Sequence, residues 1–213
     1  MWNGVVEANA PSPAIARRAI FRICKSHTNL KDHTMSTYGA AQMASSFRTV
    51  RANTILIAED IPESKYDYVA APGTQSVAAM LKHIAIAPML YEDMHRQHRV
   101  TTLKGYDFPT AIGRMRAEEV KPRSKAEIVA LLKSEGDRFA SWLESVSEEF
   151  LAETYTDPSG QHSNSRMASL MSPKEHEMHH RGQLMLIERL LGIVPHLTRQ
   201  QEARMQQHAK SAN

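Results

Sequence analysis

Cysteine is nearly absent from this chain of 213 residues: the single Cys24 excludes a disulfide within the chain and a cysteine-rich zinc module. No apolar run approaches the roughly 20 residues that a membrane-spanning helix needs. Aromatic residues make up only 6%, and nine glycines and ten prolines are too few for a turn-dense β-sandwich or barrel. The composition predicts a mostly helical cytoplasmic protein with no membrane partner.

The excess of positive charge is confined to the N-terminal segment. Residues 1–34 hold five basic and two acidic residues, whereas the remainder holds 21 of each. A body with balanced charge offers no broad basic surface to a polyphosphate, so we expect no nucleic-acid partner. We interpret residues 1–34 as a flexible N-terminal extension or the product of an upstream start. Residues 35–197 are then the folded domain, and 198–213 a polar C-terminal tail, either a short solvated helix or frayed.

Apolar residues recur at intervals of three and four along four segments of the chain, as they do on the buried face of a helix. These segments cover residues 38–60, 75–99, 124–150 and 172–191. No segment shows a convincing period-two strand pattern. The sequence therefore predicts an all-α fold, a four-helix bundle.

Local signals predict where these helices begin and end. Capping boxes at Ser124–Glu127 and Ser172–Glu175 predict the starts of the third and fourth helices. Gly192 is placed to end the fourth helix in a left-handed conformation. Residues 101–123 and 154–165 are predicted as loops, because glycine, proline and polar residues dominate them.

Histidine is abundant, with eleven residues, and it is densest in the run from His176 to His180. On a helix these two residues are four apart on the same face, so both imidazoles can reach one metal ion. His179 is rotated away from them. His83, beside apolar residues of the second helix, is the best candidate for a third ligand. Gln183, seven residues beyond His176, is a candidate to contact one of the metal-binding histidines or to face the substrate.

Two structural alternatives and one functional alternative compete with this metal site. The histidines could form an exposed polar helix face, or His83 could be a core histidine satisfied by its neighbours. The run from His176 to His180 also matches H-E-x-x-H, in which Glu177 would be the general base of a zinc metalloprotease. The extended protease motif fails, because Gln183 and Leu186 stand where glycine and a third histidine are required.

Two stretches carry a family resemblance. The run His176-Glu-Met-His-His-Arg-Gly-Gln183, followed by Leu-Met-Leu-Ile-Glu-Arg-Leu-Leu-Gly192, resembles the last helix of the DinB-like (damage-inducible, DinB/YfiT-like) metalloenzyme superfamily. The segment Ser76-Val-Ala-Ala-Met-Leu-Lys-His83-Ile-Ala is similar to the second helix of that family. The resemblance covers about residues 36–195.

The resemblance implies an up-down-down-up four-helix bundle, a divalent metal ion on His83, His176 and His180, and a homodimer. Three imidazoles suit zinc or nickel, with iron, copper and manganese as further candidates. Gly182 is expected to allow a close approach of the last helix to a neighbour.

The implied activity is that of a metal-dependent thiol-S-transferase or hydrolase acting on a small molecule. The metal would lower the pKa of a bound thiol or water, and a low-molecular-weight thiol would be the partner in the first case. The alternative is a non-catalytic stress-response protein that binds a metal or a small ligand. No residue of the sequence is assigned as a catalytic acid or base.

Overall fold

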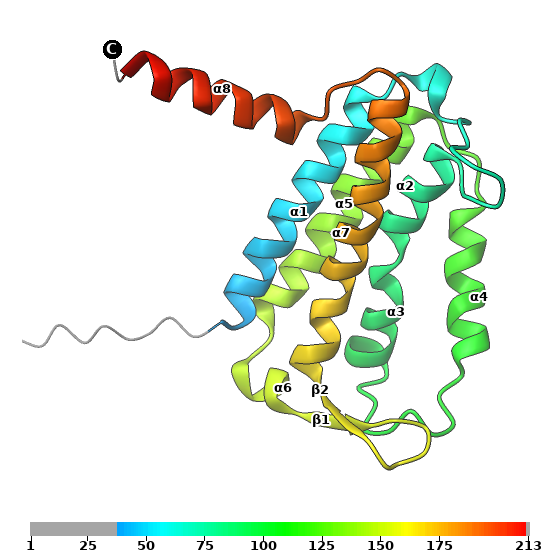
Figure 1. The fold of residues 1–213 in the computed structure, drawn as a ribbon. Helices are drawn as coiled ribbons and strands as arrows, with labels where there is room; N and C mark the ends of the chain where they lie inside the picture. Colours follow the sequence, from blue (N-terminus) through cyan, green and yellow to red (C-terminus); the bar gives the residue numbers. More distant parts are fainter. Residues whose placement is uncertain (1–37, 212–213) are drawn as a thin grey trace, which may run out of the picture. The chain divides into compact units, whose positions relative to one another are not determined.

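The computed structural model describes residues 38–211, and within them it has an all-α four-helix bundle, as predicted. The bundle consists of α1 (Ala40–Asp60), α2 (Val77–Ile86), α5 (Lys125–Ser145) and α7 (Arg166–Leu190). Both α1 and α2 pack against α5 and α7 (Figure 1). The predicted extension, residues 1–34, lies outside the described residues. Along residues 38–211 no helix has the length and apolar character required to cross a membrane.

Shorter elements connect and flank these four helices. They are the 3-10 turn η1 (Glu63–Lys65), α3 (Pro88–Glu92), the π-helical turn η2 (Asp93–Gln97), α4 (Phe108–Glu119), α6 (Glu148–Ala152), the strands β1 (Thr154–Thr156) and β2 (Ser163–Ser165), and α8 (His196–Ser211). The strands form an antiparallel hairpin with Tyr155 opposite Asn164, where a loop was predicted. The predicted second helix is divided among α2, α3 and η2. The predicted third helix is divided between α5 and α6.

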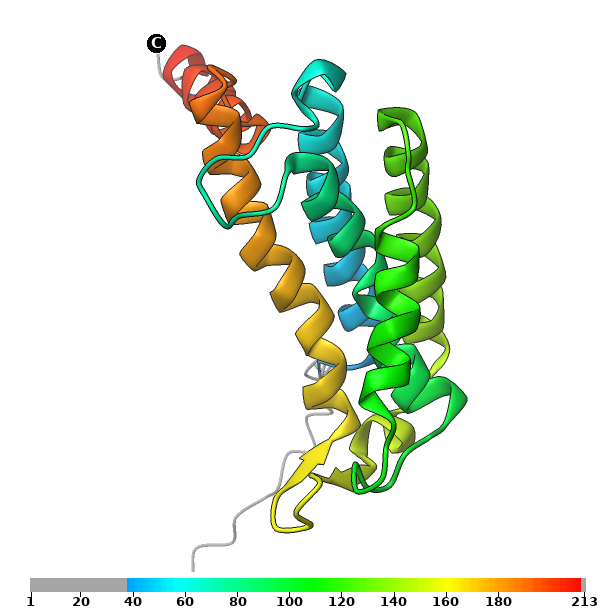
Figure 2. The same cartoon turned by 90° about the vertical axis from the view of Figure 1, so that its right-hand side faces the viewer.

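The prediction of a loop over residues 101–123 is wrong, because α4 occupies most of it. α1 and α7 run in one direction, whereas α2 and α5 both run in the other (Figure 1). The chain must therefore return along the bundle between α2 and α5, and α4 makes this return while packing against α2 (Figure 2). The Asp107 side chain caps α4 by accepting from the Thr110 amide at 3.0 Å.

Helix capping confirms one predicted start and corrects the other. Ser124 and Glu127 form the capping box of α5. The predicted start at Ser172 is wrong, because Ser165 caps α7 by accepting from the Ala168 amide at 3.1 Å. Gly192 has the predicted left-handed conformation, with a φ of 78°.

The end of the chain is helical as far as Ser211, and every described residue from Arg199 onward is exposed. Its first turn contacts α1: the His196 Nε2 atom lies 3.0 Å from Asn53 Oδ1, and Arg199 pairs with Asp60 at 2.7 Å. These contacts position the start of α8.

A polar layer separates two apolar clusters in the bundle core. One cluster includes Ile57, Leu132 and Leu184, and the other includes Phe47 and Leu170. Along both α1 and α7 the two clusters are separated by a stretch that carries a buried charged side chain. The polar residues that meet there are described next.

Arg51 of α1 contacts all three other bundle helices from this buried layer. Its Nε atom lies 3.0 Å from both carboxylate oxygens of Glu177 on α7, and Nη1 donates to the Leu132 carbonyl at 2.9 Å. Its Nη2 atom donates to the Ile84 carbonyl of α2 at 3.2 Å. Pro88 stands four residues after Ile84 and has no N–H, so Arg51 supplies the donor that this carbonyl lacks within its own helix.

Glu188 is a buried carboxyl group that this layer does not include. It is fully buried, and neither carboxylate oxygen has a hydrogen-bond partner within residues 38–211. Burial, with a smaller contribution from Asp60, raises the pKa of Glu188 to about 7. Folded protein thus keeps this proton up to about pH 7, whereas the unfolded chain releases it near its ordinary pKa of 4.5.

We expect the stability contributed by the Glu188 proton to fall as the pH rises from about 4.5 to above 7. Glu188→Gln keeps the neutral form at every pH. Its free energy of unfolding, relative to the unmodified protein, should therefore increase by about 2–3 kcal/mol between pH 5 and pH 8. Urea unfolding at each pH measures this difference. Glu202→Gln, at an exposed position of α8, is the control, and a difference that is constant with pH for Glu188→Gln would contradict the prediction.

Candidate metal centre

Three histidine rings from two helices meet at the side of the bundle. His83 lies on α2, and His176 and His180 lie one turn apart on α7. The Nε2 atom of His176 is 3.0 Å from Nε2 of His83 and 3.1 Å from Nε2 of His180. One ligand atom from each residue lies within 4.8 Å of the others, and all three residues are half-buried. The structure thus brings together the three histidines that the sequence singled out.

Two of these rings are oriented by acceptors on their outer side. The Nδ1 atom of His83 lies 2.8 Å from Glu119 Oε1, and the Nδ1 atom of His180 lies 2.8 Å from Gln183 Oε1. A carboxylate or amide oxygen can only accept, so both Nδ1 atoms carry the proton. The Nε2 atoms of both rings then carry lone pairs that face His176.

Glu119 is a residue of the site that the sequence analysis missed. It is the last residue of α4, within the segment predicted as a loop. Two signals could have revealed this helix: Asp107 is a good capping residue just before Pro109, and Phe108, Ala111 and Met115 recur at helical intervals. Gly105 and Gly113 favoured the prediction of a loop instead.

Burial and proximity disfavour protonation of the two histidines on α7. Burial, and then the neighbouring His180 and His83, lower the pKa of His176 to about 4. Burial also lowers the pKa of His180, although the hydrogen bond that its Nδ1 atom donates to Gln183 acts in the opposite direction. Neutral imidazoles are the form that binds a metal ion.

Two of the nitrogen separations are close to those of a zinc site. Zinc bonds to histidine nitrogen at roughly 2.0–2.1 Å, so two ligands of a tetrahedral site lie about 3.3 Å apart. The two Nε2 separations from His176, 3.0 and 3.1 Å, are close to that value. A metal-binding histidine typically donates its other ring N–H to an acceptor, which fixes the orientation of the ring. Glu119 and Gln183 are such acceptors for His83 and His180.

Glu177 does not face this cluster. Its side chain is only 1% exposed and pairs with Arg51 on the inner side of α7. A carboxylate engaged in the core in this way is not available to activate water, which counts against the protease interpretation of H-E-x-x-H. The inward stripe of α7 is centred on Glu177, Leu184 and Ile187, so His176 lies at its margin and Gln183 is exposed.

Gly182 has no close neighbour, contrary to expectation. It is exposed, and a Cβ atom added there would meet nothing within 4 Å among the atoms of the described chain. Its small size does not serve helix packing in this bundle. His179 lies outside the cluster, as predicted, and its Nε2 atom is 3.2 Å from Gln183 Nε2.

A cavity of about 500 Å³ opens beside the histidines. His83, His180 and Gln183 line one part of it, and Met80 of α2, the C-terminal half of α7 and the segment 70–75 line the remainder. A bound ion at the cluster would therefore face a space large enough for a small molecule.

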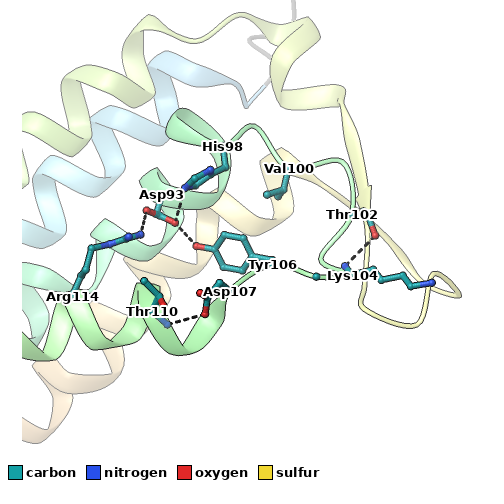
Figure 3. Close-up of a pocket in the computed structure, with 10 residues that line it drawn as sticks. Asp93, His98, Val100, Thr102, Lys104, Tyr106, Asp107, Thr110 and Arg114 are labelled. Carbon is teal, nitrogen blue, oxygen red and sulfur yellow. Dashed lines mark hydrogen bonds and ion pairs between the residues drawn. The ribbon is translucent and has the colours of Figure 1, made fainter.

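A second cavity, of about 470 Å³, lies away from the histidine cluster and differs in chemistry (Figure 3). Five of its ten lining residues are ionisable acids or bases other than tyrosine. They are Asp93, His98, Lys104, Asp107 and Arg114. Asp93 accepts from the Tyr106 hydroxyl and from Arg114, each at 2.5 Å, which fixes α4 against η2 (Figure 3). These polar groups position α4, and with it Glu119.

Comparison with known sequences decides the family. The sequence model of the DinB superfamily matches residues 46–184, which include all three histidines. The chain belongs to the DinB superfamily. No curated protein matches this DinB-superfamily chain.

Solved structures share the fold of this DinB-superfamily protein. A DinB-like protein from Bacillus subtilis, YjoA, is 22% identical, with a TM-score of 0.54 over 71% of this chain and 92% of its own. YfiT from Bacillus subtilis is 17% identical, with a TM-score of 0.57 over 76% of this chain and 92% of its own. YfiT is described as a probable metal-dependent hydrolase with an unusual four-helix bundle topology. A DinB-like protein from Bacillus cereus is 19% identical, with a TM-score of 0.54 over 72% of this chain and 93% of its own.

Proposed function

We propose that this DinB-superfamily protein is a metal-dependent enzyme, a hydrolase or a thiol-S-transferase, that acts on a small molecule. The observation that carries the proposal is the convergence of three Nε2 atoms, from His83, His176 and His180, beside a cavity of about 500 Å³. A divalent ion bound there supplies a Lewis acid that lowers the pKa of a bound water or thiol. Zinc or nickel is the metal we propose first, because neutral imidazoles suit both.

The protein contributes orientation and a restricted volume to this chemistry. Glu119 and Gln183 accept the Nδ1 protons of His83 and His180, so the Nε2 lone pairs of these two rings are directed at one point. Arg51 fixes both helices of the site, because it binds the Ile84 carbonyl next to His83 and the Glu177 side chain next to His176. The description of YfiT supports hydrolysis as one of the two reactions.

A non-catalytic binding protein is the second candidate, and one observation favours it. Within residues 38–211, no aspartate, glutamate or lysine lines the cavity, so the imidazoles are the only described bases beside a bound ligand. A protein with this arrangement would bind a metal and a small molecule without turnover. Formation of a homodimer, a cytoplasmic location and the use of a low-molecular-weight thiol are further parts of our proposal that rest on the family.

Elemental analysis and turnover separate the two candidates. Protein purified without a histidine tag is expected to contain about one equivalent of a divalent transition metal. It should hydrolyse small esters, or transfer a thiol to small electrophiles, and it should lose this turnover after chelation and regain it with zinc or nickel. Full metal content without turnover would favour the binding protein, and turnover unchanged by chelation would contradict the metal-dependent enzyme.

A further inference from the structure

The cavity beside the histidines has walls of apolar side chains. They belong to α7, to α2 and to the segment 70–75. The apolar lining residues are Ala70, Ala71, Met80, Leu186, Ile187 and Leu190. Leu186 and Leu190 are 59% and 56% exposed, an unusual position for two leucines one turn apart unless a ligand or another surface covers them.

Local contacts define the conformation of the segment opposite these leucines. Val69 and Ser76 pair as an antiparallel bridge at its base. Within it, the Thr74 hydroxyl donates to the Ala71 carbonyl at 2.7 Å, and Gly73 has the φ of 80° that the turn requires. Figure 2 shows the loop that contains this segment beside the C-terminal half of α7, and residues of both line the cavity.

Charge is absent from these walls. The lining residues within the described chain include no aspartate, glutamate, lysine or arginine, and the polar groups other than the two imidazoles are Thr74, Gln75 and Gln183. An ionised carboxylate or sulfonate placed among these walls, away from the histidine cluster, would lose its hydration without gaining a cationic partner, which is costly. The cavity shown in Figure 3, of similar volume, has such partners in Lys104 and Arg114.

We infer that the cavity binds the uncharged, largely apolar part of the substrate, whose reactive group lies at the histidine cluster. This inference rests on the proposed function, because it takes the cavity as the substrate side of the metal centre. Leu186 and Leu190 contact this apolar part, and the Gln183 amide is placed between it and His180. Substrates that carry an acidic group on this part are excluded.

Two fluorescent probes with one carbon skeleton test the inference. N-phenyl-1-naphthylamine is uncharged, and 8-anilinonaphthalene-1-sulfonate adds a single sulfonate. With the full-length, zinc-loaded protein, we expect the uncharged probe to bind with at least tenfold higher affinity. Equal or tighter binding of the sulfonate would overturn the inference.

Variants of the cavity wall test whether the uncharged probe binds in this cavity. Leu190→Glu and Leu186→Glu are both expected to weaken binding of the uncharged probe at least tenfold. Met178→Glu, at a 44% exposed position of the same helix outside the cavity, should leave it unchanged. Melting temperatures verify that each variant is folded. If Leu190→Glu unfolds, Leu186→Glu provides the same test. Probe binding unaffected by both leucine variants would overturn the inference.

His176→Ala separates this inference from the proposed function. His176 is not among the cavity-lining residues, so the variant should still bind the uncharged probe within about twofold of the unmodified affinity. Loss of probe binding in folded His176→Ala would overturn the inference. Failure of the unmodified protein to bind any metal, with the probe results as expected, would instead overturn the proposed function alone.

Discussion

Replacement of His176 by alanine is expected to abolish tight metal binding. His176 Nε2 lies within 3.1 Å of the Nε2 atoms of both other histidines, so its loss removes the central one of three ligands. Two imidazoles, one from each helix, do not make a stable site on their own. Loss of a residue that only orients a ligand lowers metal affinity by at most about 100-fold, so loss of His176 itself should lower the affinity for zinc by more than that. Competition with a chromogenic chelator measures the affinity, and turnover should fall with the metal content.

Neighbouring residues provide a graded series for the same measurement. Glu119→Gln retains an acceptor for His83 Nδ1 but loses the charge, so we expect zinc affinity to fall about 10- to 100-fold. Glu118→Gln is its matched control, because Glu118 pairs with Lys121 and Arg123 instead. His179→Ala should leave the affinity unchanged, since His179 is exposed and lies outside the cluster. Equal effects of His176→Ala and His179→Ala would contradict the site.

Replacement of Glu177 by glutamine is expected to lower the free energy of unfolding by about 3–5 kcal/mol. The variant leaves the Arg51 guanidinium buried without a charged partner, and Arg51 is only 3% exposed. Glu144→Gln is the control, because Glu144 forms an exposed pair with Arg48 on the same helix as Arg51. That surface pair should contribute at most about 1 kcal/mol. Urea unfolding followed by circular dichroism measures both values.

The same variant distinguishes a structural glutamate from a protease base. We expect folded Glu177→Gln protein to bind metal and to retain turnover, because Glu177 faces Arg51 and not the histidines. A metalloprotease base would show the opposite result, with full stability and no activity. The double variant Arg51→Met with Glu177→Leu should recover part of the lost stability, since an apolar pair leaves no unpaired charge. If Glu177→Gln lowered the free energy of unfolding no more than Glu144→Gln does, the structural role of the Arg51–Glu177 pair would be contradicted.

The helices that local sequence features specify were predictable. The interval of apolar residues predicted α1 almost to the residue, and the Ser124–Glu127 capping box marked the start of α5. The start of α7 was predicted too late, because Pro173 is typical of a first helical turn. In the bundle Pro173 is buried in the interior of the helix, and Ser165 provides the cap.

The site was predictable only where its residues share one helix. His176 and His180 are four residues apart, and the helical repeat alone places them on one face. The contact of His83 with Glu119 spans 36 residues, and it depends on α4 returning alongside α2. No local pattern relates these two positions, so Glu119 was missed although its helix carried a capping signal.

The sequence by itself determined that this protein is a helical bundle without a disulfide inside the chain and that two histidines of its last long helix can share a metal ion. Tertiary structure decided that Glu177 turns inward to Arg51, 126 residues away, that Glu119 orients His83, and that an uncharged cavity opens beside the cluster. The reason is physical. Periodicity and capping depend on residues within one or two turns, whereas the direction a side chain faces between helices depends on how distant segments pack.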